Sequence, residues 1–215
     1  MPMTTEAYAR THLTTTGTKK PLRCSWCGND PLYQAYHDFQ WGRPEASSQR
    51  LFAKLCLDGQ QAGLSWITIL RKQAGYEAAF HHFDPVRVAS MNDADVEVLM
   101  HNTDIVRNRL KIRSIITNAR AFLQLEETQG PFNQFLWRYV DGRPLQNHWH
   151  AMADVPAKTE LSDRLAKDLK KLGFSFVGST IVYAFMQATG LVNDHLVDCI
   201  ARDDCVAEGL DFKLE

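Results

Sequence analysis

The chain has 215 residues, of which 45 % are hydrophobic and 23 % charged, and its formal net charge is −1. This composition predicts a globular protein with a substantial core. The nearly neutral charge argues against a protein that is basic over its whole surface, although a local basic face remains compatible with it. No apolar run is long enough to span a membrane and no secretion signal is visible, so we expect a cytoplasmic protein with reduced cysteines.

Residues 1–20 are polar and rich in threonine, and they show neither helical nor strand periodicity. Such a segment predicts a flexible N-terminal extension. We place the folded domain at residues 21–202 and a C-terminal tail at residues 203–215.

The segment from Trp26 to Trp66 is unusually rich in aromatic residues. Tyr33 and Tyr36 are three residues apart and would share one face of a helix. Two tyrosines and a tryptophan can wall a slot for a flat ring, which an enzyme acting on an extrahelical nucleobase requires. The alternative is that large aromatic side chains fill the core of a small domain. The candidate slot residues are Trp26, Tyr33, Tyr36, Trp41 and Trp66.

Nearly every segment after Ser47 has apolar residues at the three- and four-residue spacing of a helix. Asn92 and Thr159 are suitable N-caps, and Gly173 is suitable for ending a helix. Strand-like alternation is scarce, so we predict an all-α fold, either undivided or made of two lobes that meet at a cleft. The expected helices cover residues 48–57, 66–73, 95–100, 111–125, 161–172 and 180–188, with a loop at 141–158 and an extended link at 174–177.

Residues 94–120 have the pattern helix, short turn, helix, and cations follow the turn. A turn that opens a helix presents unpaired backbone N–H groups, which bind phosphate well. From Ile105 to Arg120 there is no acidic residue, so the segment could form a platform for a DNA backbone. The alternative is an ordinary solvated helix face. The cations are Arg107, Arg109, Lys111, Arg113 and Arg120.

Two cysteines and two histidines near opposite ends of the chain form a set suited to zinc. Cys24 and His37 lie early, whereas His195 and Cys199 lie late and are four residues apart, on one face of an expected helix. Four protein ligands fill a tetrahedral site and leave no position for water, which would make the zinc structural. Cys27 forms a Cys-x-x-Cys pair with Cys24 and is an alternative ligand to His37.

Several longer motifs follow one another in a fixed order between Arg23 and Cys199. They are Cys24-x-Trp26, Asp30-Pro-Leu-Tyr33-x-x-Tyr36-His37-Asp38, Trp41-Gly42, Gly59-Gln-Gln-Ala-Gly-Leu-Ser-Trp66, Phe83-Asp-Pro85, Gly173-Phe-x-Phe-Val-Gly178 and Gly190-Leu-Val-Asn-Asp-His195. In these motifs the chain resembles the DNA-3-methyladenine glycosylase I family, a branch of the helix–hairpin–helix base-excision glycosylases.

The resemblance implies an enzyme that flips 3-methyladenine out of alkylated double-stranded DNA and hydrolyses its N-glycosidic bond without cutting the strand. The product would be free 3-methyladenine, and the protein would be a monomer with no membrane partner. The resemblance also implies one structural zinc that ties the N- and C-terminal segments together, held by Cys24, His37, His195 and Cys199, which favours His37 over Cys27.

The resemblance further assigns roles within the aromatic segment and the hairpin. It implies a base pocket around Tyr33, Tyr36 and Trp66, with a catalytic carboxylate at Asp58. It places a loop close to the gap that the flipped base leaves, with Leu64 as a wedge. The residues expected to contact DNA are Gln61, Gly63, Leu64 and Ser65 in that loop, and Ile105, Arg107, Arg109 and Lys111 at the hairpin.

Two positions depart from the family pattern. Asp58 replaces the usual glutamate and is one methylene shorter, and Asp104 replaces the usual hairpin glycine and adds a negative charge. We expect Arg107 or Arg109 to neutralise Asp104, or DNA affinity to be reduced. These departures keep a second hypothesis open, namely a catalytically weak relative that binds DNA or a base without efficient excision. A third hypothesis is a hydrolase with a catalytic zinc.

Overall fold

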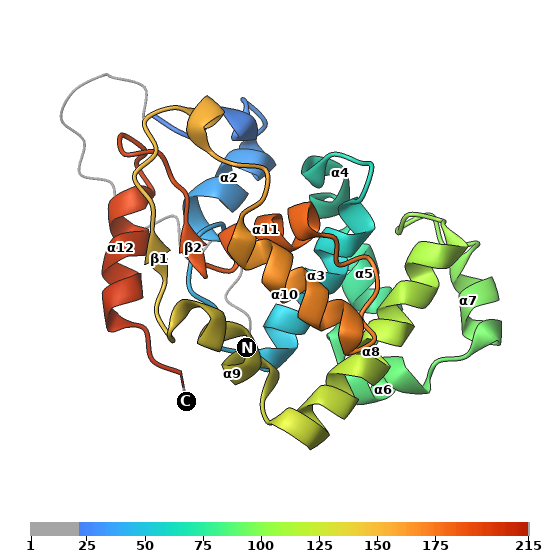
Figure 1. Ribbon diagram of the computed structural model, residues 1–215. Coiled ribbons are helices and arrows are strands. Elements are labelled where there is room, and N and C mark those ends of the chain that lie inside the picture. The colour runs from blue at the N-terminus through green and yellow to red at the C-terminus, as the bar shows by residue number, and fades with distance from the viewer. Residues whose placement is uncertain (1–21, 215) are drawn as a thin grey trace.

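The computed structural model describes residues 22–214, so the expected extension at residues 1–20 lies outside the described part. Helices dominate this part of the chain (Figure 1). The elements are η1 (Ser25–Cys27), α2 (Pro31–Phe39), α3 (Ser48–Gln61), α4 (Trp66–Leu70), α5 (Gln73–Ala79), η2 (His81–Phe83), α6 (Pro85–Ser90), α7 (Asp93–Leu99), α8 (Arg109–Gln129), α9 (Phe132–Trp137), η3 (Arg138–Val140), β1 (Leu145–Gln146), η4 (Met152–Asp154), α10 (Glu160–Lys171), α11 (Ser179–Ala188), β2 (Val192–Asn193) and α12 (Arg202–Asp211).

Helix α3 is the centre of the molecule, and it packs against α4, α8, α9 and α11. Leu51, Phe52 and Leu55 on α3 are fully buried. The long helix α8 contributes the expected apolar stripe, in which Ile112 and Ile115 are fully buried. Burying these side chains contributes roughly 1.5–3 kcal/mol each and so fixes α3 as the rigid support of its neighbours.

Side-chain caps set the helix boundaries where the sequence predicts them. Asn92 and Asp95 form a capping box at the start of α7, and Thr159 caps α10. Each cap satisfies backbone N–H groups that a helix start would otherwise leave unpaired. The other expected helices are present with small shifts of their ends, but α3 continues to Gln61, four residues beyond the expected boundary, and the helix expected at 66–73 ends at Leu70, with α5 beginning at Gln73.

Two features of the second half depart from the expectations. Strands β1 and β2 form a short parallel ladder that pairs Leu145 with Val192 and Gln146 with Asn193, within a predominantly helical fold. Strands of two residues are too short to leave an alternating pattern in the sequence. The expected tail at 203–215 is largely the helix α12, because Cys205 is buried and Phe212 packs against Trp137.

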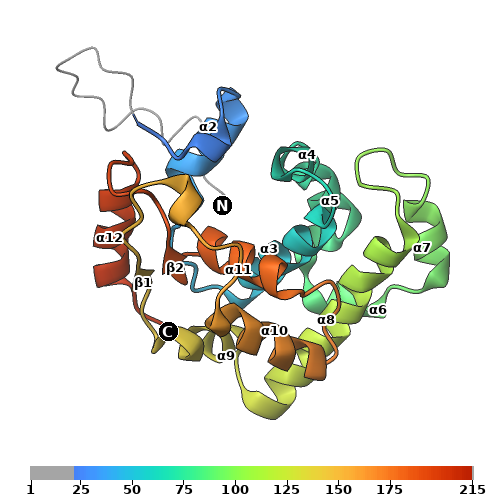
Figure 2. The same cartoon turned by 45° about the horizontal axis from the view of Figure 1, so that its top comes forward.

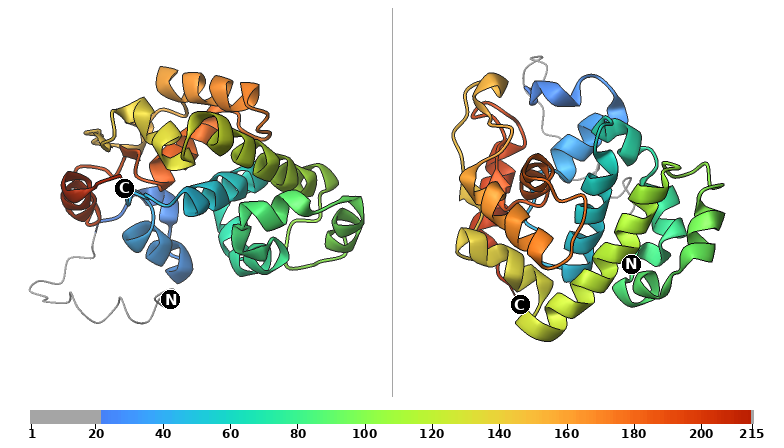
Figure 3. Two further views of the ribbon diagram at one scale, coloured as in Figure 1. Left: turned by 90° about the horizontal axis from the view of Figure 1, so that it is seen from below. Right: turned by 45° about the vertical axis from the view of Figure 1, so that its right-hand side comes forward.

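Figure 3 shows α5, α6 and α7 on one side of α3, and α12 on the other. In Figure 2, α2 and α4 rise from the same face of the body, above α3 and α11. No helix among residues 22–214 is both long and apolar enough to cross a membrane.

Candidate active site and metal centre

The five aromatic residues singled out in the sequence line one cavity of about 190 Å³. Tyr33 and Tyr36 share a face of α2 as expected, and Trp26 packs edge-on against both, with ring centroids 5.1 and 6.3 Å away. The rings of Tyr36 and Trp66 lie 5.4 Å apart. Trp41 packs edge-on against Trp26 at 5.1 Å. These rings therefore wall a slot of the size of a flat ligand instead of filling the main core.

Other walls of this cavity come from segments to which the sequence gave no role. Met152 comes from η4 and Val155 is the residue after it, and Ala184, Gln187 and Ala188 come from α11. Two charged residues also line it, Lys54 from α3 and Asp194 from the chain just after β2. The cavity is thus lined from α2, α3, α4 and α11, and Figure 2 shows α2 and α4 standing apart above α3 and α11.

Asp58 lies in the last turn of α3 and is only 2 % exposed. Its Oδ1 accepts a hydrogen bond from the ammonium of Lys54, one helical turn earlier, whereas its buried Oδ2 has no partner among residues 22–214. Burial raises the pKa of Asp58, and the charge of Lys54 opposes that change. An unpaired buried carboxylate oxygen is costly, so this atom is available to accept a hydrogen bond from a ligand.

Lys54, one helical turn before Asp58 on α3, also lines the slot. Its ammonium lies 3.8 Å from the ring centroid of Trp66, in cation–π contact. Burial lowers the pKa of Lys54, while Asp58 raises it in opposition. The sequence signal for this pair is the four-residue spacing of Lys54 and Asp58, which share a face only if α3 runs past Leu57.

Asp194 is the second buried carboxylate on the cavity wall, and all its lone-pair directions are used. Its Oδ1 accepts hydrogen bonds from the side chains of Asn147 and Trp149, at 2.6 and 2.8 Å. Its Oδ2 accepts from Tyr183 and Gln187, at 2.6 and 2.8 Å. Asp194 therefore ties the loop after β1 to α11 and is a structural element of the cavity wall.

Residues 62–65 form the loop between α3 and α4, at the edge of the cavity. Gly63 has φ +75°, a left-handed conformation that glycine adopts without strain. Leu64 is 38 % exposed, and Gln61, which lines the cavity, donates a hydrogen bond to the Leu64 carbonyl at 2.8 Å. Ser65 precedes α4 and hydrogen-bonds Thr68. The loop thus presents an exposed leucine beside the slot.

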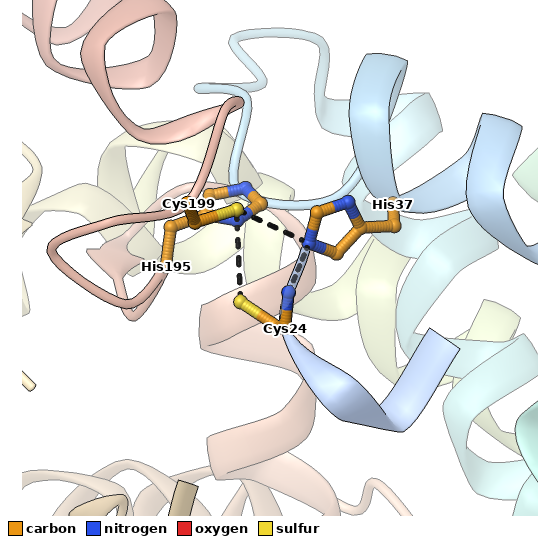
Figure 4. A group of neighbouring side chains, drawn as sticks. All are labelled: Cys24, His37, His195 and Cys199. Atoms are coloured by element: carbon orange, nitrogen blue, oxygen red, sulfur yellow. Dashed lines mark hydrogen bonds between the residues drawn. The ribbon is translucent and has the colours of Figure 1, made fainter. Parts of the chain in front are cut away.

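The four residues expected to bind zinc meet in a buried cluster (Figure 4). Their ligand atoms all lie within 4.8 Å of one another. Cys199 Sγ lies 3.4 Å from His37 Nε2 and 3.3 Å from His195 Nδ1, and Cys24 Sγ lies 3.7 Å from the same His195 nitrogen. Two thiols and two imidazoles converging in this way are suited to a tetrahedral metal ion.

The outward-facing nitrogens of both histidines are held by other groups. His37 Nδ1 lies 2.7 Å from a carboxylate oxygen of Asp38, which itself accepts hydrogen bonds from Arg23. His195 Nε2 lies 3.1 Å from the Trp41 carbonyl. Such partners orient the imidazoles so that His37 Nε2 and His195 Nδ1 face the cluster, where His37 Nε2 also accepts a hydrogen bond from the Cys24 backbone N–H at 3.3 Å. Hydrogen bonds from Cys24 and from the two histidines lower the pKa of Cys199, which favours the thiolate that a metal requires.

The local geometry of this cluster differs from the expectation in one respect. It also shows that His37, and not Cys27, faces the other candidate ligands. His195 and Cys199 lie on a loop between β2 and α12, not on a helix, with a turn closed by the bond from Cys199 N to Leu196 O. Cys27 is outside the cluster, and its thiol donates to the Cys24 carbonyl. The candidate metal ligands are therefore Cys24 and His37 from the N-terminal segment, with the loop pair from the C-terminal one.

The cluster and the aromatic cavity share two walls. Trp26 contacts His37 at a centroid distance of 5.2 Å, and Trp41 contacts His195 at 4.6 Å. Gly42 leaves room for this packing, since a Cβ there would lie 3.0 Å from the His195 ring. A metal in the cluster would therefore brace the tryptophans that line the slot.

Residues 100–108 join α7 to α8 and pack closely on α5. Ile105 is buried, the backbone N–H of Val106 donates to the Tyr76 hydroxyl at 3.1 Å, and a Cβ at Gly75 would collide with Asp104. Arg107 is exposed. Neither Arg107 nor Arg109 pairs with Asp104 within residues 22–214, so the expected neutralisation of Asp104 is not found there.

The cations that follow this turn are mostly engaged elsewhere, which corrects the expectation of a free basic platform. Lys111 is only 7 % exposed and its ammonium donates to the carbonyls of Gln60 and Ala62 at 2.7 Å, which holds it at the C-terminal end of α3. Arg109 and Arg113 form ion pairs with acidic residues of α7, and Arg120 bonds backbone carbonyls. Of the five, only Arg107 has no partner in the described part of the chain.

Comparison with known proteins places this chain in a family. The model of the methyladenine glycosylase family matches residues 26–202. DNA-3-methyladenine glycosylase 1 of Escherichia coli strain K12 is 54 % identical over 177 residues, which cover 82 % of this chain and 95 % of that protein. DNA-3-methyladenine glycosylase of Haemophilus influenzae is 49 % identical over 82 % of this chain and 96 % of its own length.

Solved structures agree with this assignment. A crystal structure of 3-methyladenine DNA glycosylase I superposes with a TM-score of 0.83 at 54 % identity, covering 84 % of this chain and 100 % of that one. A structure that concerns 3-methyladenine recognition by the enzyme from Staphylococcus aureus gives 0.82 at 40 % identity, covering 84 % and 96 %. The predicted family is confirmed: the chain belongs to the methyladenine glycosylase family, a family of glycosylase enzymes.

Proposed function

We propose that this protein excises 3-methyladenine from alkylated double-stranded DNA by hydrolysing its N-glycosidic bond, with the base flipped into the aromatic slot and the strand left uncut. The observation that carries the proposal is the partly unsatisfied Asp58 carboxylate among aromatic rings. Relatives 54 % and 49 % identical are named for this activity, and a relative at 40 % identity has been solved in complex with 3-methyladenine.

The slot suits a cationic purine. Methylation at N3 makes adenine cationic in DNA, and the faces of Tyr36 and Trp66 attract a cation by roughly 1–2 kcal/mol when it is desolvated. Asp58 accepts hydrogen bonds from the base through its free Oδ2 and complements its charge. Burial raises the pKa of Tyr36, so this side chain stays a neutral phenol that stacks on the base.

The chemical step requires little acid catalysis, because the cationic base is already a good leaving group. The bond between C1′ of the sugar and the glycosidic nitrogen breaks, and its electron pair goes to the base, which leaves uncharged. Water forms the new bond to C1′ and loses a proton. Asp58 holds the base in the geometry from which the bond breaks, and the aromatic walls exclude bulk water from it.

We assign the DNA contacts to two segments on the rim. The loop with Gln61, Gly63, Leu64 and Ser65 inserts Leu64 into the gap left by the flipped base, since this leucine is exposed beside the slot. Residues 100–108 act as the hairpin of a helix–hairpin–helix unit, in which Ile105 anchors the turn and Arg107 contacts a phosphate. Arg109 can join only by leaving its ion pair with Glu97.

The proposal is tested by the release of free bases from methylated duplex DNA, identified by chromatography, for the wild-type protein beside Asp58→Glu. We expect rapid release of 3-methyladenine by the wild type, and intact abasic strands on a denaturing gel. Absence of release with DNA binding intact would contradict the proposal.

One observation favours a second candidate, a relative that binds without efficient excision. The shorter Asp58 is paired with Lys54, so one of its two oxygens is already engaged in the slot. In that case the wild type would bind methylated DNA without releasing base, and Asp58→Glu would gain activity because its longer side chain reaches further into the slot.

We also propose that Cys24, His37, His195 and Cys199 hold one structural Zn²⁺. The two thiols, the two oriented imidazoles and their burial support a closed tetrahedral site, which adds cross-linking and no reactive position. Metal analysis should find about one zinc per chain, and Cys199→Ser should lose it and lower the unfolding temperature. A catalytic zinc is the less favoured alternative, and it would predict loss of turnover on chelation without loss of stability.

A further inference from the structure

Lys54 occupies the interactions that a cationic base would make. Its ammonium lies 3.8 Å from the centroid of Trp66 and bonds Asp58, so it holds both the aromatic face and the carboxylate to which the proposed function assigns the base. A second cation cannot take this position while the first remains, because the two would repel one another at short range in a poorly hydrated site.

The ammonium of Lys54 is not fixed there by other bonds. Among the described residues, its only hydrogen bond goes to Asp58, although an ammonium has three donors. Lys111 is the contrasting case, because its ammonium is held by two backbone carbonyls. Lys54 can therefore move at the loss of one ion pair and one cation–π contact.

Space for this movement lies on the other side of Lys54. A neighbouring cavity of about 370 Å³ is lined by Lys54 and Trp66 and also by Glu77. The Glu77 carboxylate accepts a hydrogen bond from the neutral amide of Gln73, at 2.9 Å, and has no cationic partner in the described part of the chain. The same cavity holds Glu45, whose carboxylate pairs with Arg50. An ammonium turned out of the slot would find its counter-charge at Glu77.

We propose that Lys54 is a specificity-determining residue. When the slot is empty, its ammonium occupies the position of the base against Asp58 and Trp66. It turns toward Glu77 to admit a cationic base, and it returns to displace the base after bond cleavage. The inference rests on the proposed function. When Lys54 leaves the slot, a cationic base restores the positive charge beside Asp58, whereas an undamaged adenine leaves that carboxylate without a counter-charge. Competition with Lys54 therefore lowers the affinity for the neutral base more than for the cationic one. The excised base has taken the bonding electrons and is neutral, so the returning ammonium favours its release.

The test is the affinity for free 3-methyladenine, measured by quenching of tryptophan fluorescence and by calorimetry for the wild type, Lys54→Met and Lys54→Gln. Methionine keeps the length of the side chain without its charge, and glutamine serves if the methionine variant does not fold. We expect both variants to bind the free base at least about fivefold more tightly, the factor that corresponds to one cation–π contact. Product inhibition of base release should strengthen by the same factor, and affinity for unmodified adenine should rise too.

The direction of the effect separates competition from a supporting role, since loss of a supporting residue weakens binding. Lys167→Met removes an exposed charge from α10, away from the slot, and should leave the affinity unchanged. Unchanged or weaker binding by Lys54 variants that keep the wild-type unfolding temperature would overturn the role of Lys54. The proposed function would still stand in that case if the wild type releases 3-methyladenine. Failure of the wild type to release or bind 3-methyladenine would overturn both.

Discussion

Asp58 and Asp194 are both buried carboxylates on the wall of one cavity, and they differ in how their oxygens are satisfied. Asp194 accepts four side-chain hydrogen bonds, whereas Asp58 has one ion pair and an oxygen that no group in the described part of the chain bonds. A satisfied buried carboxylate stabilises the segments that donate to it. An unsatisfied one weakens the fold but can bind a ligand, so the comparison separates a structural acid from a reactive one.

The largest expected effect comes from removing the structural acid. Asp194→Ala leaves four buried donors without an acceptor, and we expect a loss of about 4 kcal/mol in the free energy of unfolding, since each unpaired group costs about 1–3 kcal/mol. Urea unfolding followed by circular dichroism measures this loss. Asp194→Asn, which keeps one acceptor oxygen, should lose less. A free energy of unfolding equal to that of the wild type would show that Asp194 has no structural role.

Substitution of Asp58, the proposed ligand of the base, should have the opposite effects, namely a large loss of activity and a small loss of stability. Asp58→Asn removes the charge that orients the cationic base, and we expect release of 3-methyladenine to slow by about a hundredfold. The unfolding temperature should change little, because Lys54 can turn into the neighbouring cavity when its partner is neutral. Single-turnover base release and thermal unfolding on the same preparation test both halves. A large loss of stability with near-normal activity would assign Asp58 a structural role instead.

The pH dependence of activity sharpens the same contrast. In the proposed mechanism Asp58 acts as the ionised carboxylate, and burial raises its pKa above 3.8. The proportion of active enzyme therefore falls as the pH decreases through this raised pKa, so the acid limb of kcat/KM should lie above the ordinary range of an aspartate. The charge of Lys54 lowers the pKa of Asp58, so the limb should move further upward in Lys54→Met. An acid limb at the ordinary value would show that Asp58 is hydrated in the working enzyme.

The smallest effect is expected from a residue that contacts both the cavity and the structural carboxylate. Gln187 lines the cavity and donates one of the four hydrogen bonds to Asp194. Gln187→Ala should cost about 1 kcal/mol of unfolding free energy, the typical net value of one hydrogen bond, and should change base release only slightly. Calorimetric unfolding beside the base-release assay would check this. A rate loss comparable to that of Asp58→Asn would instead make Gln187 a direct ligand of the base.

Local sequence signals were sufficient where the cause of the structure is local. The capping residues Asn92 and Thr159 start α7 and α10 as predicted, and the apolar stripe of α8 is buried as its spacing predicts. The positions of Tyr33 and Tyr36 on one helix face follow from their spacing. Caps and periodicity act within a few residues, so they can be recognised without knowledge of the fold.

Charges could not be assigned from the sequence in the same way. No acidic residue lies between Ile105 and Arg120, yet α7 supplies carboxylates to Arg109 and Arg113 from across the turn. Lys111 has the sequence context of a surface cation, but the end of α3 covers it. Electrostatic partners depend on which helices pack together, and that information lies outside the segment that carries the charge.

The sequence by itself determined the helical fold, the aromatic segment, the family and the four candidate metal ligands, because motifs in a fixed order carry these features. Only the tertiary structure brought residues 24 and 37 to residues 195 and 199, placed Lys54 on Trp66 and Asp58, and gave Asp194 its four donors. Apart from the ion pair of Lys54 with Asp58, which lies within α3, these arrangements depend on contacts between different helices and loops. In a buried site a charged group has no water to bond, so its protein partners decide its role. A carboxylate with all its oxygens bonded supports the fold, and one with an unbonded oxygen can bind a ligand.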